Sequence, residues 1–118
     1  NANPASMLAA LDVLHEMPGR RYALLGDILD LGSAEADGHR SVGEHAARVV
    51  DALFTVGPRG AQIATAARAA DARTVHHFDS KEEAVEVLRA NLGPGDVLLV
   101  KASRGLRLGT VVAELITS

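Results

Sequence analysis

The sequence of 118 residues contains no cysteine and no tryptophan, and it holds only two phenylalanines and one tyrosine. The absence of cysteine excludes disulfides, thiolate-ligated zinc and a thiol nucleophile, and it suits a reducing cytoplasm. So few aromatic side chains cannot build a platform on which bases stack. The formal charge of −3 also lacks the basic footprint of a nucleic-acid-binding protein. Nucleic acid is therefore not an expected partner.

Long apolar runs are missing as well. No stretch approaches the ~18 residues that a membrane span requires, and no signal-peptide pattern opens the chain. We therefore expect a cytoplasmic protein without a membrane partner. The hydrophobic content of 47% and the charged content of 23% are typical of a globular protein. A chain of this length predicts a single domain over residues 1–118.

Short apolar segments alternate with helical ones along the chain, a pattern typical of α/β proteins. The apolar segments predict strands at residues 22–25, 53–56, 74–78 and 97–100. The remaining periodic segments predict helices at about residues 4–17, 37–50, 61–70, 80–92 and 107–116. Asn3 is a favoured cap and Pro4 a favoured first residue for the first helix. This order favours a doubly wound, mostly parallel sheet with helices on both faces.

Ligands of such open sheets bind at the carboxyl ends of the strands, which nominates the loops at residues 26–32, 57–60, 78–80 and 101–107. The last of these loops carries Lys101, Ser103 and Arg104 just before a predicted helix. Two cations and the amides of a helix start suit a carboxylate or a phosphate. Alternatively, the two cations are solvated and Ser103 is a helix cap. Spacing alone favours neither interpretation.

The loop at residues 26–32 places Asp27 and Asp30 three residues apart after a strand. Two carboxylates there could hold an ammonium group, a metal or a ribose. The residues by themselves favour a simpler interpretation, a turn in which Asp side chains bond their own backbone. The loop Gly57-Pro58-Arg59-Gly60 is rich in glycine but lacks the signature of a phosphate-binding loop.

The five histidines do not predict a metal site. His39 and His45 are six residues apart, which matches one helix face poorly, and no His-Glu-x-x-His pattern is present. His76 and His77 are adjacent on a predicted strand and must point to opposite faces. We interpret each of them as a surface or hydrogen-bonded histidine rather than a ligand.

Taken together, these segments resemble the C-terminal domain of the Mur ligases, which form amide bonds in bacterial cell-wall precursors. They are most similar to the ligases that add D-alanyl-D-alanine. The resemblance runs in the same order over essentially the full chain. It is carried by the opening Asn-Ala-Asn-Pro-Ala-Ser-Met, residues 25–32, His39, Gly43, residues 54–57 and residues 95–105.

The resemblance implies a Rossmann-like domain that was excised from a larger enzyme, because the chain starts inside the family's opening motif. The enzyme would phosphorylate the terminal carboxylate of a UDP-MurNAc-tripeptide, and the amine of D-Ala-D-Ala would then attack the acyl phosphate. ATP and Mg²⁺ would be held mainly by a central domain, the partner of this chain in cis. The C-terminal domain would close over the nucleotide and present the dipeptide. We expect the isolated chain to be inactive and to contain neither catalytic residues nor a metal site.

The resemblance also implies roles for individual residues. Ala102 stands where the family usually has glycine, at the turn expected to border the dipeptide. Asn1 and Asn3 would lie near the nucleotide. The expected substrate-binding residues are Lys101, Ser103, Arg104, Asn3, Asp27 and His39.

Two alternatives to this interpretation remain. The chain could come from another Mur-type ligase, such as a folylpolyglutamate or cyanophycin synthetase, whose C-terminal domain shares the fold. It could also be a stand-alone Rossmann-like binding module without a catalytic partner. The Asn-Ala-Asn-Pro opening combined with Val-Lys-x-Ser-Arg-Gly argues against the first alternative, and a phosphate-loop domain upstream in the reading frame would exclude the second.

Overall fold

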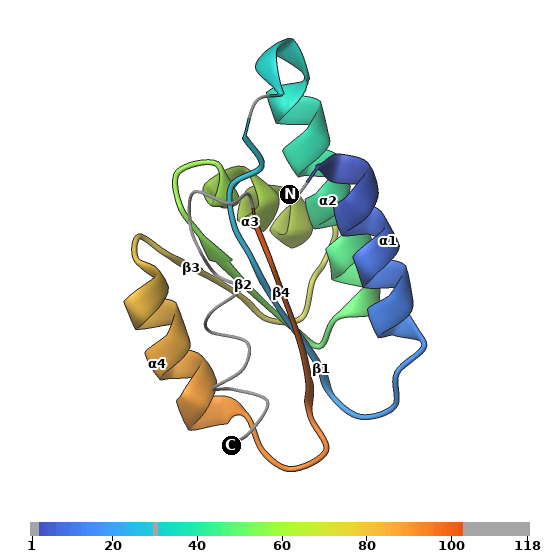
Figure 1. Ribbon diagram of the computed structural model, residues 1–118, viewed down its shortest axis with the longest axis vertical. Helices are drawn as coiled ribbons and strands as arrows, with labels where there is room; N and C mark the ends of the chain where they lie inside the picture. The colour runs from blue at the N-terminus through green and yellow to red at the C-terminus, as the bar shows by residue number, and fades with distance from the viewer. Residues whose placement is uncertain (1–2, 30, 103–118) are drawn as a thin grey trace.

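The fold is known from a computed structural model that describes residues 3–29 and 31–102. Within these residues, four parallel strands form one sheet in the order β3-β2-β1-β4 (Figure 1). All three strand pairings are parallel, which confirms the predicted fold class. The predicted helix at residues 107–116 lies outside the described residues. The strands are β1 (Arg21–Leu25), β2 (Ala52–Val56), β3 (Val75–Phe78) and β4 (Val97–Lys101).

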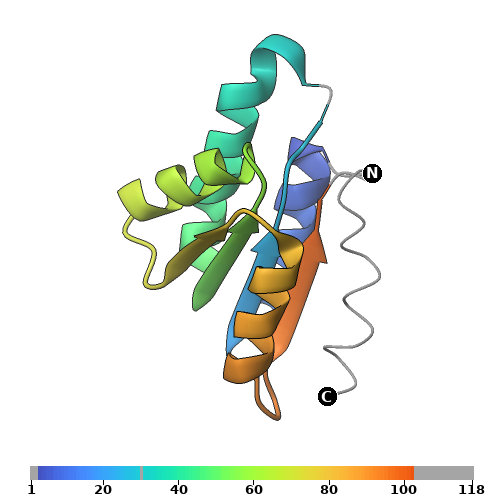
Figure 2. The ribbon, with the colours of Figure 1, turned by 90° about the vertical axis from the view of Figure 1, so that its left-hand side faces the viewer.

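Helices cover both faces of the sheet, and the described chain also holds a short 3-10 turn, η1 (Gly32–Ala34). The helices α1, α2 and α3 lie on one face, and α4 lies on the other (Figure 2). α2 begins two residues earlier than predicted because η1 leads directly into it. The helices are α1 (Pro4–His15), α2 (Glu35–Val49), α3 (Gly60–Ala69) and α4 (Lys81–Asn91).

Alternate residues of each strand supply the two cores. In β1, Ala23 and Leu25 pack with α1, α2 and α3, whereas Tyr22 and Leu24 pack on the face that carries α4. Phe54 is stacked on Phe78 in this second core, with ring centroids 5.9 Å apart. The period of two along each strand therefore places apolar side chains on both faces, as a sheet covered by helices requires.

Local capping explains where two of the helices begin. The Asn3 side chain accepts a hydrogen bond from the Ser6 amide at 2.8 Å, and the Ser6 hydroxyl oxygen accepts one from the Asn3 amide at 3.0 Å. This reciprocal pair satisfies two amides that a helix start otherwise leaves unpaired. At α4, the Ser80 hydroxyl oxygen accepts from the Glu83 amide at 3.2 Å. The cap predicted at Asn3 is confirmed, and Ser80 is a second cap of the same kind.

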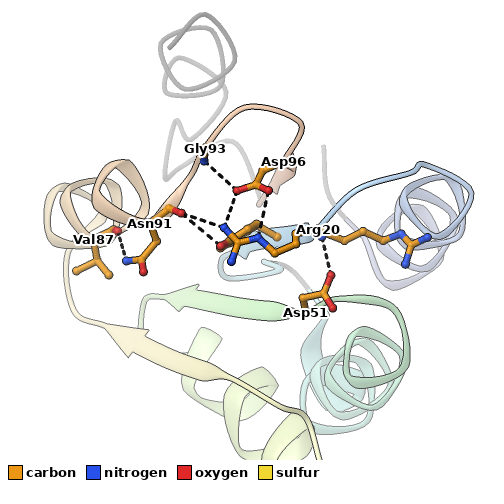
Figure 3. A network of polar contacts seen from close by, with 8 residues as sticks. Arg20, Asp51, Val87, Asn91, Gly93 and Asp96 are labelled. Atoms are coloured by element: carbon orange, nitrogen blue, oxygen red, sulfur yellow. Dashed lines mark hydrogen bonds and ion pairs between the residues drawn. The ribbon is translucent and has the colours of Figure 1, made fainter.

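The edge of the sheet at which the strands begin, here the amino edge, is held by an ion pair (Figure 3). The Arg20 guanidinium donates to both Asp96 carboxylate oxygens, at 3.2 and 3.0 Å, and to the Asn91 carbonyl at 3.3 Å. The Gly93 amide donates to Asp96 at 2.9 Å. Since Arg20 precedes β1 and Asp96 precedes β4, this network joins the two loops that enter neighbouring strands.

Candidate functional site

The edge at which the strands end, here the carboxyl edge, brings the predicted loops together. Because all strands are parallel, Leu25 at the end of β1 lies in register with Thr55 of β2 and with Lys101 of β4. The next residue, Gly26, donates its amide hydrogen to the Lys101 carbonyl at 3.1 Å. The loop at residues 26–32 therefore begins directly beside Lys101, which confirms that the two segments share one edge.

The start of α1 reaches the same region. A Cβ placed on Gly38, in the first turns of α2, would lie 3.0 Å from Pro4 Cγ and 2.9 Å from Leu31 Cδ1. Glycine at this position allows α1, α2 and the loop at residues 26–32 to approach one another closely. The capping residue Asn3, next to Pro4, is consequently near this loop.

Asp27 caps a helix that lies far away in the sequence. Its side chain is 7% exposed, and its Oδ1 accepts hydrogen bonds from the amides of Arg59 at 2.8 Å and Gly60 at 2.9 Å. These two amides belong to the start of α3, where a negative charge is favourable. The interpretation of Asp27 as a residue that bonds its own turn is therefore wrong, because the carboxylate turns toward α3. Asp30 lies outside the described residues.

The glycine-rich loop between β2 and α3 is shaped around this carboxylate. Gly57 has a φ of +93°, and a Cβ there would lie 2.6 Å from Asp27 Oδ1. The amides that follow it point at a carboxylate of the chain itself. This helix start therefore does not fit the phosphate of a nucleotide, in agreement with the absence of a phosphate-loop signature.

His39 is buried beneath the loop at residues 26–32, with no exposed surface. Its Nε2 lies 3.0 Å from the Ile28 amide nitrogen, and its Nδ1 lies 2.7 Å from the Glu35 carbonyl oxygen. An amide can only donate and a carbonyl can only accept, so Nε2 is the acceptor and Nδ1 carries the hydrogen. His39 is thus a neutral, hydrogen-bonded histidine between two backbone groups, rather than a side chain on the outer surface.

Arg59 and Glu35 join the starts of α3 and α2. Arg59 Nε donates to Glu35 Oε1 at 2.6 Å, and Gln62 Nε2 donates to Glu35 Oε2 at 3.2 Å. The hydrogen bond from Arg59, followed by that from Gln62, lowers the pKa of the Glu35 carboxyl group below its ordinary value. Arg59 also places NH1 3.6 Å from Asp27 Oδ2. Sequence reasoning missed this pair, because its members are 24 residues apart and share no motif.

The other predicted site residues divide into two groups. Lys101 is half-buried at the end of β4, and its side chain makes no hydrogen bond or ion pair within the part of the chain that the structure describes. Such a cation at a strand end is available to an anionic group. Asn1, Ser103 and Arg104 lie outside the described residues.

A threonine, a histidine and an aspartate also meet near the end of β3. Thr55 Oγ1 is 2.8 Å from His77 Nδ1, and His77 Nε2 is 4.0 Å from Asp79 Oδ1. Thr55 is completely buried, so its hydroxyl cannot reach a substrate as a nucleophile. This group therefore links β2 to β3 and is not a catalytic triad.

A groove of about 550 Å³ runs between α2 and α3, lined mostly by alanine. None of the predicted site residues that the structure describes lines it. Among residues 3–29 and 31–102, no three acidic or histidine side chains gather in a way that could hold a metal ion. No helix in these same ranges is long and apolar enough to cross a membrane.

Comparison with known proteins identifies the family. Residues 1–104 match the family described as Mur ligase, glutamate ligase domain. The UDP-N-acetylmuramoyl-tripeptide--D-alanyl-D-alanine ligase of Bacillus subtilis is 35% identical over 100% of this chain and 27% of its own length. The ligase of the same name from Escherichia coli is 36% identical over 98% of this chain and 25% of its own length.

Solved structures agree with this relationship. The MurF ligase from Thermotoga maritima, solved in complex with ADP, has a TM-score of 0.81 and 26% identity, covering 98% of this chain and 26% of that one. MurF from Acinetobacter baumannii also has a TM-score of 0.81, covering 100% of this chain and 27% of that one, at 26% identity. The chain thus spans about a quarter of the length of the relatives that it matches. Since the family match covers most of the sequence, the chain belongs to the Mur ligase family and forms the C-terminal domain of such a ligase.

Proposed function

We propose that this chain is the closing domain of an ATP-dependent ligase that joins D-Ala-D-Ala to UDP-MurNAc-tripeptide during peptidoglycan precursor synthesis. The observation that carries the proposal is the match, over 98–100% of the chain, to relatives that bear the name of this ligase. That name favours this activity over those of the folylpolyglutamate and cyanophycin synthetases. A match to only a quarter of each relative favours a part of a larger enzyme over a stand-alone binding module.

The carboxyl edge is the face that would meet the rest of the ligase. It gathers Asn3, the loop at residues 26–32 and Lys101, which come from three distant parts of the sequence. The Lys101 ammonium group would attract the carboxylate of the incoming dipeptide and orient its amine toward the acyl phosphate. Closure of this edge would hold the reactants together and keep water from the acyl phosphate.

The glycine-rich start of α3 does not fit the phosphates of a nucleoside triphosphate, because its amides already bind the Asp27 carboxylate. ATP and Mg²⁺ would therefore be bound mainly by the central domain of the cytoplasmic, full-length enzyme. Asn1 would border the nucleotide and Ser103 and Arg104 the dipeptide. These three assignments rest on the resemblance to the family alone.

The test uses the full-length ligase and the two lysines of this chain. Lys101→Met should lower kcat/KM for D-Ala-D-Ala by about ten- to a hundred-fold, the effect of losing one charge-assisted hydrogen bond. The KM for ATP should stay unchanged. Lys81→Met is the matched control, because Lys81 begins α4 after β3, and two strands separate β3 from β4 in the sheet.

The outcomes separate the activity from the role of Lys101. Release of phosphate from ATP that depends on both the UDP-muramoyl tripeptide and D-Ala-D-Ala supports the activity. A wild-type enzyme without that dependence would overturn the activity. If Lys101→Met and Lys81→Met both retain wild-type dipeptide kinetics, Lys101 is a solvated lysine without a role in binding.

A further inference from the structure

We propose that Asp27 and His39 are positioning residues, which hold residues 26–28, the start of the loop at residues 26–32, in one conformation beside Lys101 and do not themselves bind substrate. The inference rests on the proposed function, since the reaction whose geometry they support is that of the ligase. It differs from the resemblance-based expectation, which placed both side chains against a substrate.

The partners of the two side chains support a positioning role. Both side chains are buried, and their shortest hydrogen bonds all join backbone groups of the chain itself. The Asp27 carboxylate accepts hydrogen bonds from the two amides at the start of α3. His39 accepts a hydrogen bond from an amide of the loop and donates one to a carbonyl of α2. His39 could bind a ligand through Nε2 only by leaving the buried Ile28 amide unpaired. The Asp27 carboxylate is only 7% exposed and already accepts from two amides, which leaves little of it open to a ligand.

Three consecutive residues of the loop are tied to three different elements. The Gly26 amide binds the Lys101 carbonyl of β4 at 3.1 Å, and the Asp27 carboxylate binds the start of α3. The Ile28 amide binds His39 of α2, while the Ile28 side chain is completely buried in the core. The loop therefore cannot shift relative to Lys101 without breaking at least one of these ties. These hydrogen bonds therefore fix the position of residues 26–28 relative to Lys101.

His39 offers a matched pair of variants, because its two ring nitrogens have different tasks. The side-chain amide of asparagine can replace Nδ1 and donate to the Glu35 carbonyl, but it is too short to reach the Ile28 amide. The side-chain oxygen of glutamine can replace Nε2 and accept from that amide. His39→Gln thus keeps the tie to the loop, and His39→Asn removes it while keeping the bond within α2.

The experiment measures two properties of the full-length ligase for both variants. Hydrogen exchange of the segment at residues 26–32 reports directly on the loop, and steady-state kinetics report on the reaction. In His39→Asn, loss of one buried hydrogen bond should speed exchange and lower kcat/KM for D-Ala-D-Ala by about tenfold each, with the KM for ATP unchanged. His39→Gln should stay close to wild type in both measurements.

Leu88→Ala provides the control for general loss of stability. Leu88 belongs to α4 and is completely buried in the core on the other face of the sheet. This variant should lower the melting temperature without speeding exchange at residues 26–32 or lowering dipeptide kcat/KM.

Asp27→Asn tests the other positioning residue, since the side-chain oxygen of asparagine can still accept hydrogen bonds from both α3 amides. It should keep the loop protected if hydrogen bonding, rather than charge, positions Asp27.

The possible results decide the proposal. Faster exchange and slower turnover in His39→Asn, with both restored in His39→Gln, support it. Wild-type exchange in His39→Asn would show that His39 does not hold the loop. Faster exchange with unchanged dipeptide kinetics would show that the loop position does not matter to the reaction. A wild-type ligase that does not use D-Ala-D-Ala would overturn the proposed function, while the exchange data would still decide whether His39 holds the loop.

Discussion

The two edges of the sheet are held by different kinds of interaction. At the amino edge, Arg20 and Asp96 form an ion pair whose arginine side chain is 61% exposed. At the carboxyl edge, the buried side chains of Asp27 and His39 bond backbone groups of distant elements. An exposed ion pair contributes little because water and salt screen it, whereas breaking a buried side chain–backbone bond leaves a polar group unpaired. Side-chain truncation should therefore destabilise the carboxyl edge more.

The largest effect should follow from Asp27→Ala. This change removes the acceptor of two amides at the start of α3, and it should lower the free energy of unfolding of the 118-residue chain by about 2–4 kcal/mol. Urea denaturation measures the loss. Asp79→Ala is the control, because the Asp79 side chain is fully exposed. Equal stability of the two variants would contradict the assignment of Asp27 as the cap of α3.

A pair of glycines compares the edges directly. Gly57 and Gly95 have similar φ angles, +93° and +87°, but only Gly57 leaves no room for a Cβ. Gly95→Ala at the amino edge should cost about 1–2 kcal/mol for backbone strain alone. Gly57→Ala should cost about 1 kcal/mol more, because its Cβ would meet the Asp27 carboxylate.

Adding Asp27→Ala to Gly57→Ala tests the cause of that extra cost. The double variant removes the carboxylate that the new Cβ would meet, so the two effects should not add. Full additivity in chemical denaturation would argue that the Gly57 loop is not shaped around Asp27.

The two edges should differ least in how their carboxyl groups make the stability of the fold depend on pH in the acid range. Hydrogen bonds from Arg20, followed by the Gly93 amide, lower the pKa of Asp96, as Arg59 and Gln62 lower the pKa of Glu35. The ordinary pKa is 3.8 for Asp96 and 4.5 for Glu35. A carboxyl group whose pKa is lowered in the folded state stabilises the fold at pH values above its ordinary pKa. This stabilisation is lost as the pH falls through the folded-state pKa.

The variants Arg20→Met and Arg59→Met should therefore each weaken the dependence of the unfolding midpoint on pH in the acid range. High salt should reduce both effects, because both arginines are partly exposed. Thermal unfolding between about pH 3 and pH 6 measures this dependence. An unchanged acid profile in both variants would contradict the assigned causes of the pKa shifts.

Part of the candidate site could be predicted from sequence rules alone. The carboxyl ends of parallel strands meet at one edge, so a shared edge for Lys101 and the loop at residues 26–32 follows once the strands are recognised. Only the tertiary structure decided that β4 pairs with β1, which brings the two side by side. The orientation of Asp27 could not be predicted in this way. Its two amide partners lie 32 and 33 residues further along the chain, and an aspartate after a strand bonds its own turn equally well in principle.

The sequence by itself determined the strands, the alternation with helices and the helix starts at Asn3 and Ser80. These features depend on residues two to four positions apart, whose relative placement the backbone geometry sets locally. Only the tertiary structure decided that Asp27 caps α3, that His39 is a neutral bridge to Ile28, and that Arg59 pairs with Glu35. The physical reason is that each of these contacts joins separate elements, and their partners are chosen by how the helices pack on the sheet.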